Sequence, residues 1–183
     1  MTQGRIVLVS GAPGTGKSTV AALLARDSTL ERSLLLHTDN FYDALCKGAI
    51  PPHKPGSQEQ NLIVIEAFRE AAKRFARGGY DVVVDGVIGP WFLEPWLQAA
   101  REGYQVHYLV LRASKEATLS RALGRTKLDA STNRELVETM WAQFADLGPW
   151  EPWSVDTTKL TPQATAKLLQ EKLQKNTNLL TGG

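Results

Sequence analysis

The eight residues from Gly11 to Ser18, GAPGTGKS, constrain the fold of this chain more than any other stretch. They fit the pattern G-x-x-x-x-G-K-[ST] at every position. An apolar run at Arg5–Ser10 precedes them, and a helix-forming run at Lys17–Arg26 follows. Glycines let backbone N–H groups turn inward around an anion, and the N-terminus of the following helix adds partial positive charge. The pattern therefore predicts a strand, a phosphate-binding loop and a helix in direct succession.

In a phosphate-binding loop of this kind, side chains also help to bind the nucleoside triphosphate and its metal ion. We expect Lys17 to reach the β- and γ-phosphates and the Ser18 hydroxyl to ligate Mg²⁺. Asp85 follows the apolar run Val82–Val84, where a buried strand would deliver a carboxylate to the same metal. An Asp at this place can also cap a turn with Gly86. The residues of this segment expected to bind ATP are Gly11, Ala12, Pro13, Gly14, Thr15, Gly16, Lys17, Ser18 and Thr19.

Short β-branched or leucine-rich runs alternate with helical patterns along the rest of the chain. The runs expected to be strands are Arg5–Ser10, Ser33–Thr38, Asp81–Asp85, Gln105–Arg112 and Ser154–Thr157. Continuous apolar strands indicate burial on both faces, as in a parallel sheet between two layers of helices. With no internal repeat or interdomain linker apparent, we expect one α/β domain over residues 1–175 and a frayed tail at 176–183.

Two capping patterns mark expected helix starts. Ser57 with Gln60, and Thr132 with Glu135, fit the capping box, in which the first side chain accepts a hydrogen bond from a helix N–H. The first of these would open a helix inside the crossover that follows the second strand.

Net charge and cysteine content limit which ligands and which cellular compartment we predict. The formal net charge is only +2, and basic residues do not cluster on an expected helix, so neither nucleic acid nor membrane is predicted. The single cysteine, Cys46, excludes an internal disulfide and fits a reducing compartment. No apolar run reaches signal-peptide or membrane-spanning length, and we expect a soluble cytoplasmic protein. Monomer and homodimer both stay open.

The order of the motifs resembles that of the small P-loop kinases. This group includes nucleoside monophosphate kinases, shikimate and gluconate kinases and chloramphenicol phosphotransferase. The likeness rests on the phosphate loop, HTDNFY after the second run, VVVDG at the third and RALGR in a later helix. It implies a five-stranded parallel sheet in the order 2-3-1-4-5, with ATP and Mg²⁺ as ligands. It also implies a substrate-binding flap at about 40–60 and a helical lid at about 121–133.

The resemblance also implies roles outside the phosphate loop. Arg121 and Arg125 are four residues apart and share one helix face, and arginines at this place in the family contact the ATP phosphates. With Lys17 they would neutralise the transferred group; two solvated helix charges are the alternative. Thr157 falls where the family's adenine-contacting loop follows the last strand.

Asp39 is the residue that decides which acceptor we predict. An alcohol must lose a proton during transfer, so a carboxylate is useful to it. A nucleoside monophosphate offers an anionic oxygen and needs positive charge instead. Asp39 matches the acceptor-binding Asp of the hydroxyl-phosphorylating members, while no arginine occurs between Arg32 and Arg69. We therefore predict a neutral alcohol as acceptor; an Asp that only forms a turn or caps a helix is the alternative.

The flap supplies further expected substrate contacts. These are Phe41, Tyr42 and His53, with Trp91 and Phe92 adding an apolar wall after the third strand. His37 and His107 lie within expected strands and are predicted to be satisfied core histidines.

The sequence thus predicts an ATP-dependent kinase of a small molecule, acting at a hydroxyl through Lys17, Asp39, Arg121 and Arg125. The alternatives are a cytidylate-like nucleoside monophosphate kinase and a regulatory ATPase that acts through a protein partner.

Overall fold

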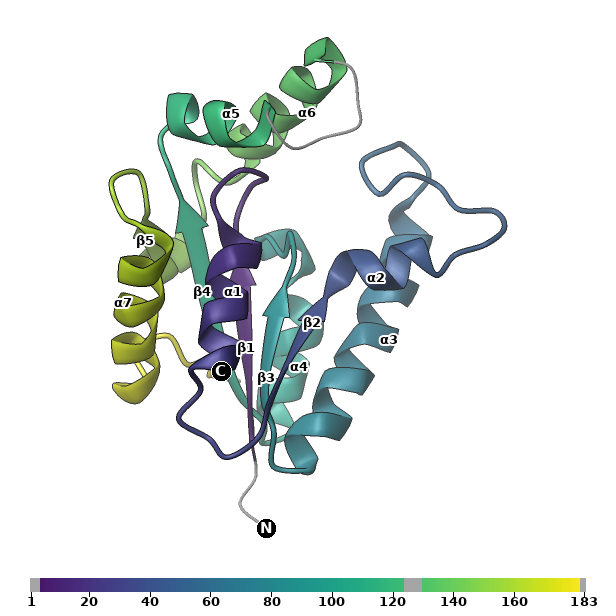
Figure 1. Cartoon of the computed structure of the whole chain (residues 1–183). Coiled ribbons are helices and arrows are strands. Elements are labelled where there is room, and N and C mark those ends of the chain that lie inside the picture. Colours follow the sequence, from purple (N-terminus) through teal and green to yellow (C-terminus); the bar gives the residue numbers. More distant parts are fainter. Residues whose placement is uncertain (1–3, 124–129, 182–183) are drawn as a thin grey trace.

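A computed structural model of the chain describes residues 4–123 and 130–181. Its five strands form one parallel sheet in the order β2-β3-β1-β4-β5, which confirms the predicted fold class and strand order (Figure 1). The strands are β1 (Arg5–Ser10), β2 (Ser33–His37), β3 (Asp81–Asp85), β4 (Gln105–Arg112) and β5 (Ser154–Asp156).

Helices follow the strands as the alternating pattern predicts. They are α1 (Lys17–Arg26), α2 (Thr38–Asp43), α3 (Gln58–Arg77), α4 (Glu94–Arg101), α5 (Lys115–Leu123), α6 (Ala130–Gln143) and α7 (Pro162–Gln174), with 3₁₀ turns at Pro90–Phe92 and Gly148–Trp153. The helix expected from the second capping pattern begins already at Ala130, ahead of Thr132. Among the described helices, none combines the length and apolarity needed to cross a bilayer.

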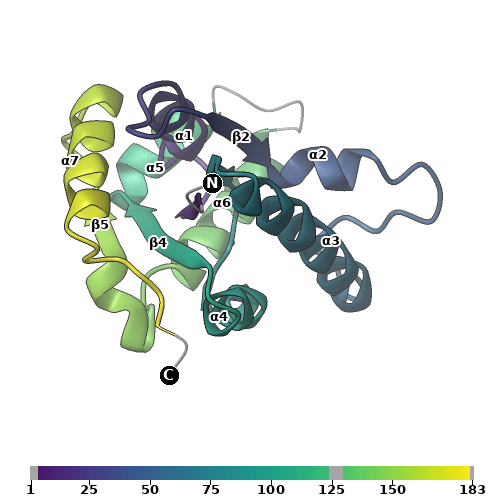
Figure 2. The same ribbon diagram turned by 90° about the horizontal axis from the view of Figure 1, so that it is seen from below.

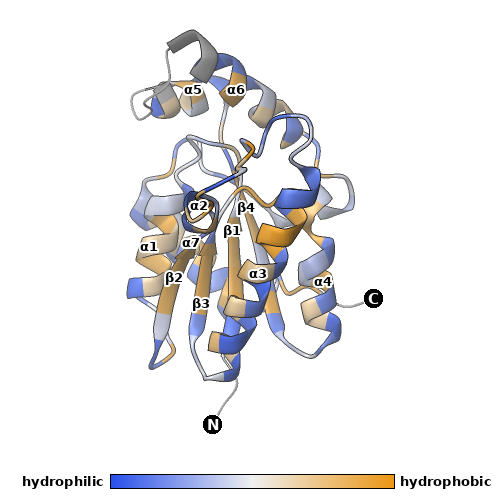
Figure 3. Cartoon of the chain, turned by 90° about the vertical axis from the view of Figure 1, so that its right-hand side faces the viewer, coloured by the Kyte–Doolittle hydropathy of each residue, from blue (hydrophilic) through white to orange (hydrophobic). Residues whose placement is uncertain are grey.

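The sheet is covered on both faces, and β1 shows how the sequence achieves this. Its side chains alternate between the faces: Ile6 and Leu8 pack into the core shared with α3 and α4. Val7 and Val9 pack into the core shared with α1 and α7. The view from below shows these two helix layers around the sheet (Figure 2). In Figure 3 the strands are the most hydrophobic part of the molecule, as expected for strands buried on both faces.

The helices α5 and α6 lie over the carboxyl ends of the strands, beside the phosphate loop (Figure 1). They share a small apolar cluster of their own, made by Leu119, Ala122 and Val137. This cluster is separate from the two cores on the sheet. The helix pair therefore forms a distinct layer over the carboxyl ends of the strands, where the polar residues of the site lie.

Part of the tail expected to fray at 176–183 packs against the sheet, within its described residues 176–181. The N–H of Tyr108 donates to the Asn178 carbonyl, the N–H of Leu180 donates to the Val106 carbonyl, and Asn178 and Leu180 are buried. The reason lies in β5, which pairs only with Val110–Arg112 of β4. The tail pairs with the part of β4 that β5 leaves exposed, where unpaired backbone groups would be costly.

Candidate active site

The phosphate loop runs from the end of β1 into α1, as its motif predicts. Gly11, Gly14 and Gly16 have φ angles of 139°, 83° and 94°. A Cβ atom on Gly14 would lie 2.4 Å from the carbonyl oxygen of Thr118 in α5, and one on Gly11 would lie 2.2 Å from that of Leu111 in β4. The glycines are therefore required by backbone conformation and by the close approach of neighbouring elements.

Lys17 begins α1 and is partly buried at the mouth of this loop. Its Nζ donates to the Ala12 carbonyl at 3.1 Å. Burial lowers the pKa of Lys17, while the negative charges of Asp85 and then Asp39 act to raise it. The fold thus brings these three predicted residues, from three different elements, into one electrostatic group. A bound polyphosphate would offset the cost of burying the ammonium.

Asp85 ends β3 and has a partner that the sequence did not indicate. His37 lies opposite it in the register of β2 and β3, and His37 Nδ1 is 2.9 Å from Asp85 Oδ2. The other carboxylate oxygen, Oδ1, is buried and has no hydrogen-bond partner among the described residues. The sequence predicts a satisfied core histidine at His37. The structure instead leaves His37 half-buried beside Asp85, as part of the site. Its signal was its place at the end of the strand next to Asp85, at one sheet edge.

A hard cation would fit beside this carboxylate. Mg²⁺ prefers oxygen ligands and keeps several waters, so an orphaned buried carboxylate oxygen is a plausible direct or water-bridged ligand. Ser18, the second predicted ligand, lies exposed in the first turn of α1. In the part of the chain that the structure describes, no group of three or more His, Cys, Asp and Glu side chains has the arrangement of a metal site.

Arg121 and Thr157 come together beside the end of β5. Arg121 Nη2 donates to the carbonyls of Thr158 at 3.1 Å and Thr157 at 3.4 Å. The Thr157 side chain is buried, and its hydroxyl lies 3.4 Å from the Thr15 carbonyl, so it joins the end of β5 to the phosphate loop. The Thr157 backbone is engaged as well, since its N–H donates to the Arg112 carbonyl at 2.7 Å. Arg125 lies outside the described residues.

A cleft of about 1270 Å³ opens beside the phosphate loop. Its lining comes from the phosphate loop, α2, the flap loop, α3, the segment after β3, and α6. Asp39, Tyr42 and His53, three of the residues expected to contact substrate, line it. Phe41 does not: its ring packs edge-to-face on that of Phe68, with centroids 4.8 Å apart, and lies partly buried against the core under α3.

The segment after β3 carries the apolar wall of the cleft and is held in place by hydrogen bonds from β1 and β4. The Ser10 hydroxyl and the Tyr108 hydroxyl each donate to the Ile88 carbonyl at 2.7 Å, and the Ile88 N–H donates back to Ser10 Oγ. The Trp91 ring lies on Gly89, where a Cβ atom would come within 2.3 Å of it. No pattern in the sequence indicates these contacts of Ser10 and Tyr108, because they join segments that are far apart in the chain.

The flap loop at 50–57 is held to the start of α3 by side chains. Ser57 precedes α3 as the capping pattern predicts, but its hydroxyl donates to the carbonyls of Pro52 and Lys54, both at 2.8 Å, and makes no cap. Asn61 Nδ2 donates to the Pro52 carbonyl at 2.9 Å. These bonds give the flap loop a defined shape at the mouth of the cleft.

The charged groups of the cleft are few. Its described lining holds two carboxylates, Asp39 and Glu135, one ammonium, Lys54, and the imidazole of His53, but no guanidinium. A phosphate on the acceptor would find no bidentate partner among these residues.

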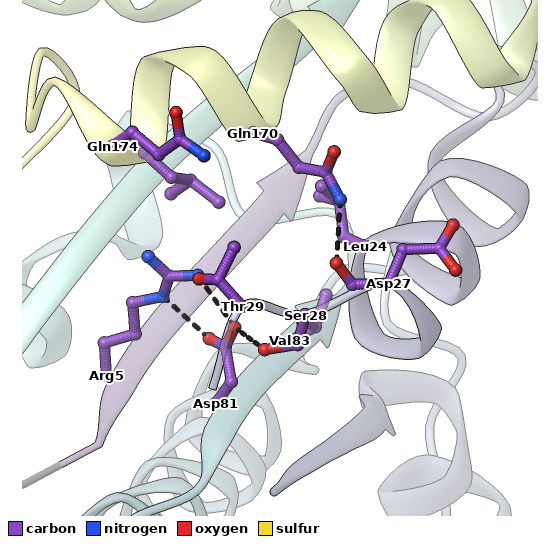
Figure 4. A pocket seen from close by; sticks show the side chains of 10 residues that line it. Arg5, Leu24, Asp27, Ser28, Thr29, Asp81, Val83, Gln170 and Gln174 are labelled. Atoms are coloured by element: carbon purple, nitrogen blue, oxygen red, sulfur yellow. Dashed lines mark hydrogen bonds and ion pairs between the residues drawn. The ribbon is translucent and has the colours of Figure 1, made fainter. Parts of the chain in front are cut away.

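A second hollow lies at the opposite edge of the sheet, where β1 and β3 begin (Figure 4). It measures about 10 Å³, which is scarcely room for one water. Arg5 Nη2 and Asp81 Oδ2 are 2.8 Å apart there, and the Ser28 hydroxyl donates to the same oxygen. Its polar groups are paired with one another, so this hollow is a structural feature.

Comparison with known proteins agrees with this geometry. A family model described as an AAA domain, AAA_18, matches residues 7–141. No curated protein matches the chain.

Three solved structures show the fold. The APS kinase of Mycobacterium tuberculosis, in complex with AMPPNP and APS, has a TM-score of 0.72 at 15% identity, covering 95% of this chain and 99% of that one. A sugar kinase from Janibacter has a TM-score of 0.68 at 19% identity, covering 93% and 95%. The tunicamycin resistance protein of Deinococcus radiodurans has a TM-score of 0.62 at 22% identity, covering 97% and 98%. The fold is that of the small P-loop kinases.

Proposed function

The chain belongs to the AAA-domain family AAA_18, and we propose that it is an ATP-dependent phosphotransferase acting on a hydroxyl group of a small molecule. One observation carries this proposal. Asp39 and the phosphate loop residue Pro13 line the same cleft, and the carboxylates of Asp85 and Asp39 both act to raise the pKa of Lys17. The transferred phosphate, a metal ligand and a carboxylate able to take a proton would therefore meet at one place. The likeness to small P-loop kinases supports the class of reaction.

The roles of the residues follow from their places. The phosphate loop and Lys17 would hold the β- and γ-phosphates, and Ser18 and Asp85 would hold Mg²⁺, which neutralises phosphate charge when bound. As the acceptor oxygen bonds to the γ-phosphorus, the bond from phosphorus to the β,γ-bridging oxygen breaks and ADP leaves. The hydroxyl proton passes to Asp39. Arg121 would exchange its carbonyl partners for the charge on the transferred group.

Asp39→Asn tests this role, since it keeps the size of the side chain and removes the base. We expect kcat to fall roughly 10²- to 10⁴-fold with ATP affinity unchanged. Asp43→Asn is the matched control, because Asp43 is exposed on the same helix and is not part of the cleft lining. Turnover of the Asp39→Asn variant close to that of the control would remove Asp39 as the base. Efficient turnover of CMP or UMP would favour the monophosphate kinase instead.

A further inference from the structure

The middle of the cleft is lined by aromatic rings that transfer to a simple hydroxyl does not require. Tyr42 comes from α2 and Phe68 from α3, while Trp91 and Phe92 come from the segment after β3. Phe68 is buried, and Tyr42 and Phe92 are half-buried. The rings therefore form a wall whose partly exposed members face the cleft.

Trp91 is the most exposed member of this wall. It keeps 46% of its surface accessible, although the segment that carries it is tied down by Ser10 and Tyr108 through Ile88. Its ring also meets Phe144 edge-to-face, with centroids 5.4 Å apart. A large apolar ring that is held rigidly and left exposed inside a cleft is a surface prepared for a flat ligand, because little side-chain freedom is lost on binding.

The charges around this wall act against an anionic ligand. Asp39 and Glu135 both line the cleft, and Lys54 on the flap is the only ammonium in the described lining. An acceptor carrying a phosphate, sulfate or carboxylate would face two negative side chains and would lose water without gaining a guanidinium partner. The volume of about 1270 Å³ also leaves space beyond that of a single sugar ring.

Resting on the proposed function, we propose that the acceptor is an uncharged alcohol that carries a planar aromatic ring. The ring lies against Trp91, and the hydroxyl group reaches Asp39. Tyr42, which also lines the cleft, is a second aromatic contact for the ring. The hydroxyl transfer is the one described above, so the ring takes part only in binding.

Matched probes test the class of acceptor. Each neutral aromatic alcohol is compared with a counterpart without the ring and one with an added anion: uridine with ribose and UMP, and 4-nitrophenyl glucoside with methyl glucoside and 4-nitrophenyl glucuronide. Binding is measured by calorimetry in the presence of AMPPNP, and transfer by ADP release with ATP. We expect a ring-bearing neutral member to bind at least about ten-fold more tightly than both of its counterparts. Equal or tighter binding of the ring-free or anionic members, or no binding of any ring-bearing one, overturns the proposal.

Substitution of Trp91 tests the place of the ring. Trp91→Leu should raise the KM of the ring-bearing acceptor about three- to ten-fold and leave the affinity for ATP unchanged, and Trp91→Phe should restore most of the loss. Phe75→Leu is the matched control, because Phe75 is similarly exposed on α3 and is not part of the cleft lining. An unchanged KM in Trp91→Leu, with ATP binding intact, overturns the assignment.

The two proposals can fail separately. Binding of a ring-bearing alcohol that depends on Trp91, without phosphoryl transfer to any acceptor, would refute the kinase and leave the ring site standing. Phosphoryl transfer to ribose or methyl glucoside, with the aromatic partner ignored, would refute the ring site and leave the kinase standing.

Discussion

Mild acid should destabilise this protein through His107, which lies in the middle of β4. Its side chain is buried, and neither ring nitrogen has a hydrogen-bond partner among the described residues. Burial, with a smaller contribution from Arg5, lowers the pKa of His107 to about 4, although Asp81 acts in the opposite direction. His107 is therefore a buried neutral histidine, and not the satisfied one that the sequence led us to expect.

The size of the effect follows from the pKa difference between the two states. In the unfolded chain the pKa of His107 returns to 6.5, against about 4 in the folded chain. Between these values the unfolded chain binds the proton and the folded chain does not, so stability is highest above pH 6.5 and falls as the pH is lowered. The full shift corresponds to about 3 kcal/mol, of which about 2 kcal/mol is lost by about pH 5.

Urea unfolding at about pH 7.5 and about pH 5 measures this loss. His107→Gln cannot titrate, so the carboxylates shared by both proteins cancel when their pH dependences are compared. We expect the wild type to lose about 2 kcal/mol more than the variant over this interval. His107→Leu provides a second non-titrating reference should the glutamine variant fail to fold. The same pH dependence in wild type and variant would refute the argument.

Three further substitutions probe the site. Gly14→Ala should weaken ATP binding and lower stability by roughly 1–3 kcal/mol, because its Cβ would meet a carbonyl oxygen of α5 at 2.4 Å. Gly48→Ala, which has a φ of 75° but open space around it, separates backbone strain from this clash in thermal unfolding and ATP titration. Phe41→Ala should cost about 2 kcal/mol of stability in urea unfolding while the acceptor KM stays constant; a KM that rises without loss of stability would place its ring in the cleft after all. His37→Phe removes the partner of Asp85 and should raise the Mg²⁺ concentration needed for half-maximal ATP binding about ten-fold or more. An unchanged Mg²⁺ titration would show that the contact with His37 does not help Asp85 to bind the metal.

Features carried by a short contiguous stretch could be predicted from the sequence. The phosphate loop is one run of eight residues, and its glycines have the positive φ angles that such a loop requires. The sheet followed from the alternation of apolar runs with helical patterns and from the resemblance to small P-loop kinases. Both depend on local chemistry and on general rules of chain connection.

Features that depend on packing between distant segments could not be predicted. Phe41 and Tyr42 are adjacent aromatics, and only the packing of α2 on α3 decides that the first packs against the core and the second lines the cleft. His37 and Asp85 are 48 residues apart and meet because β2 and β3 are neighbours. Asn178 and Leu180 bond to β4 beside the short β5, and the sequence of the tail does not reveal this.

The proposed phosphoryl transfer is tested most directly by identifying the bond that forms in the product. The chain is incubated with ATP, Mg²⁺ and the neutral alcohols, and the products are followed by phosphorus NMR. For a hydroxyl kinase we predict ADP formation that depends on an alcohol, together with a new phosphomonoester signal that is lost in Asp39→Asn. A phosphoanhydride product formed with CMP or UMP, or ATP consumption that no acceptor accelerates, would contradict it.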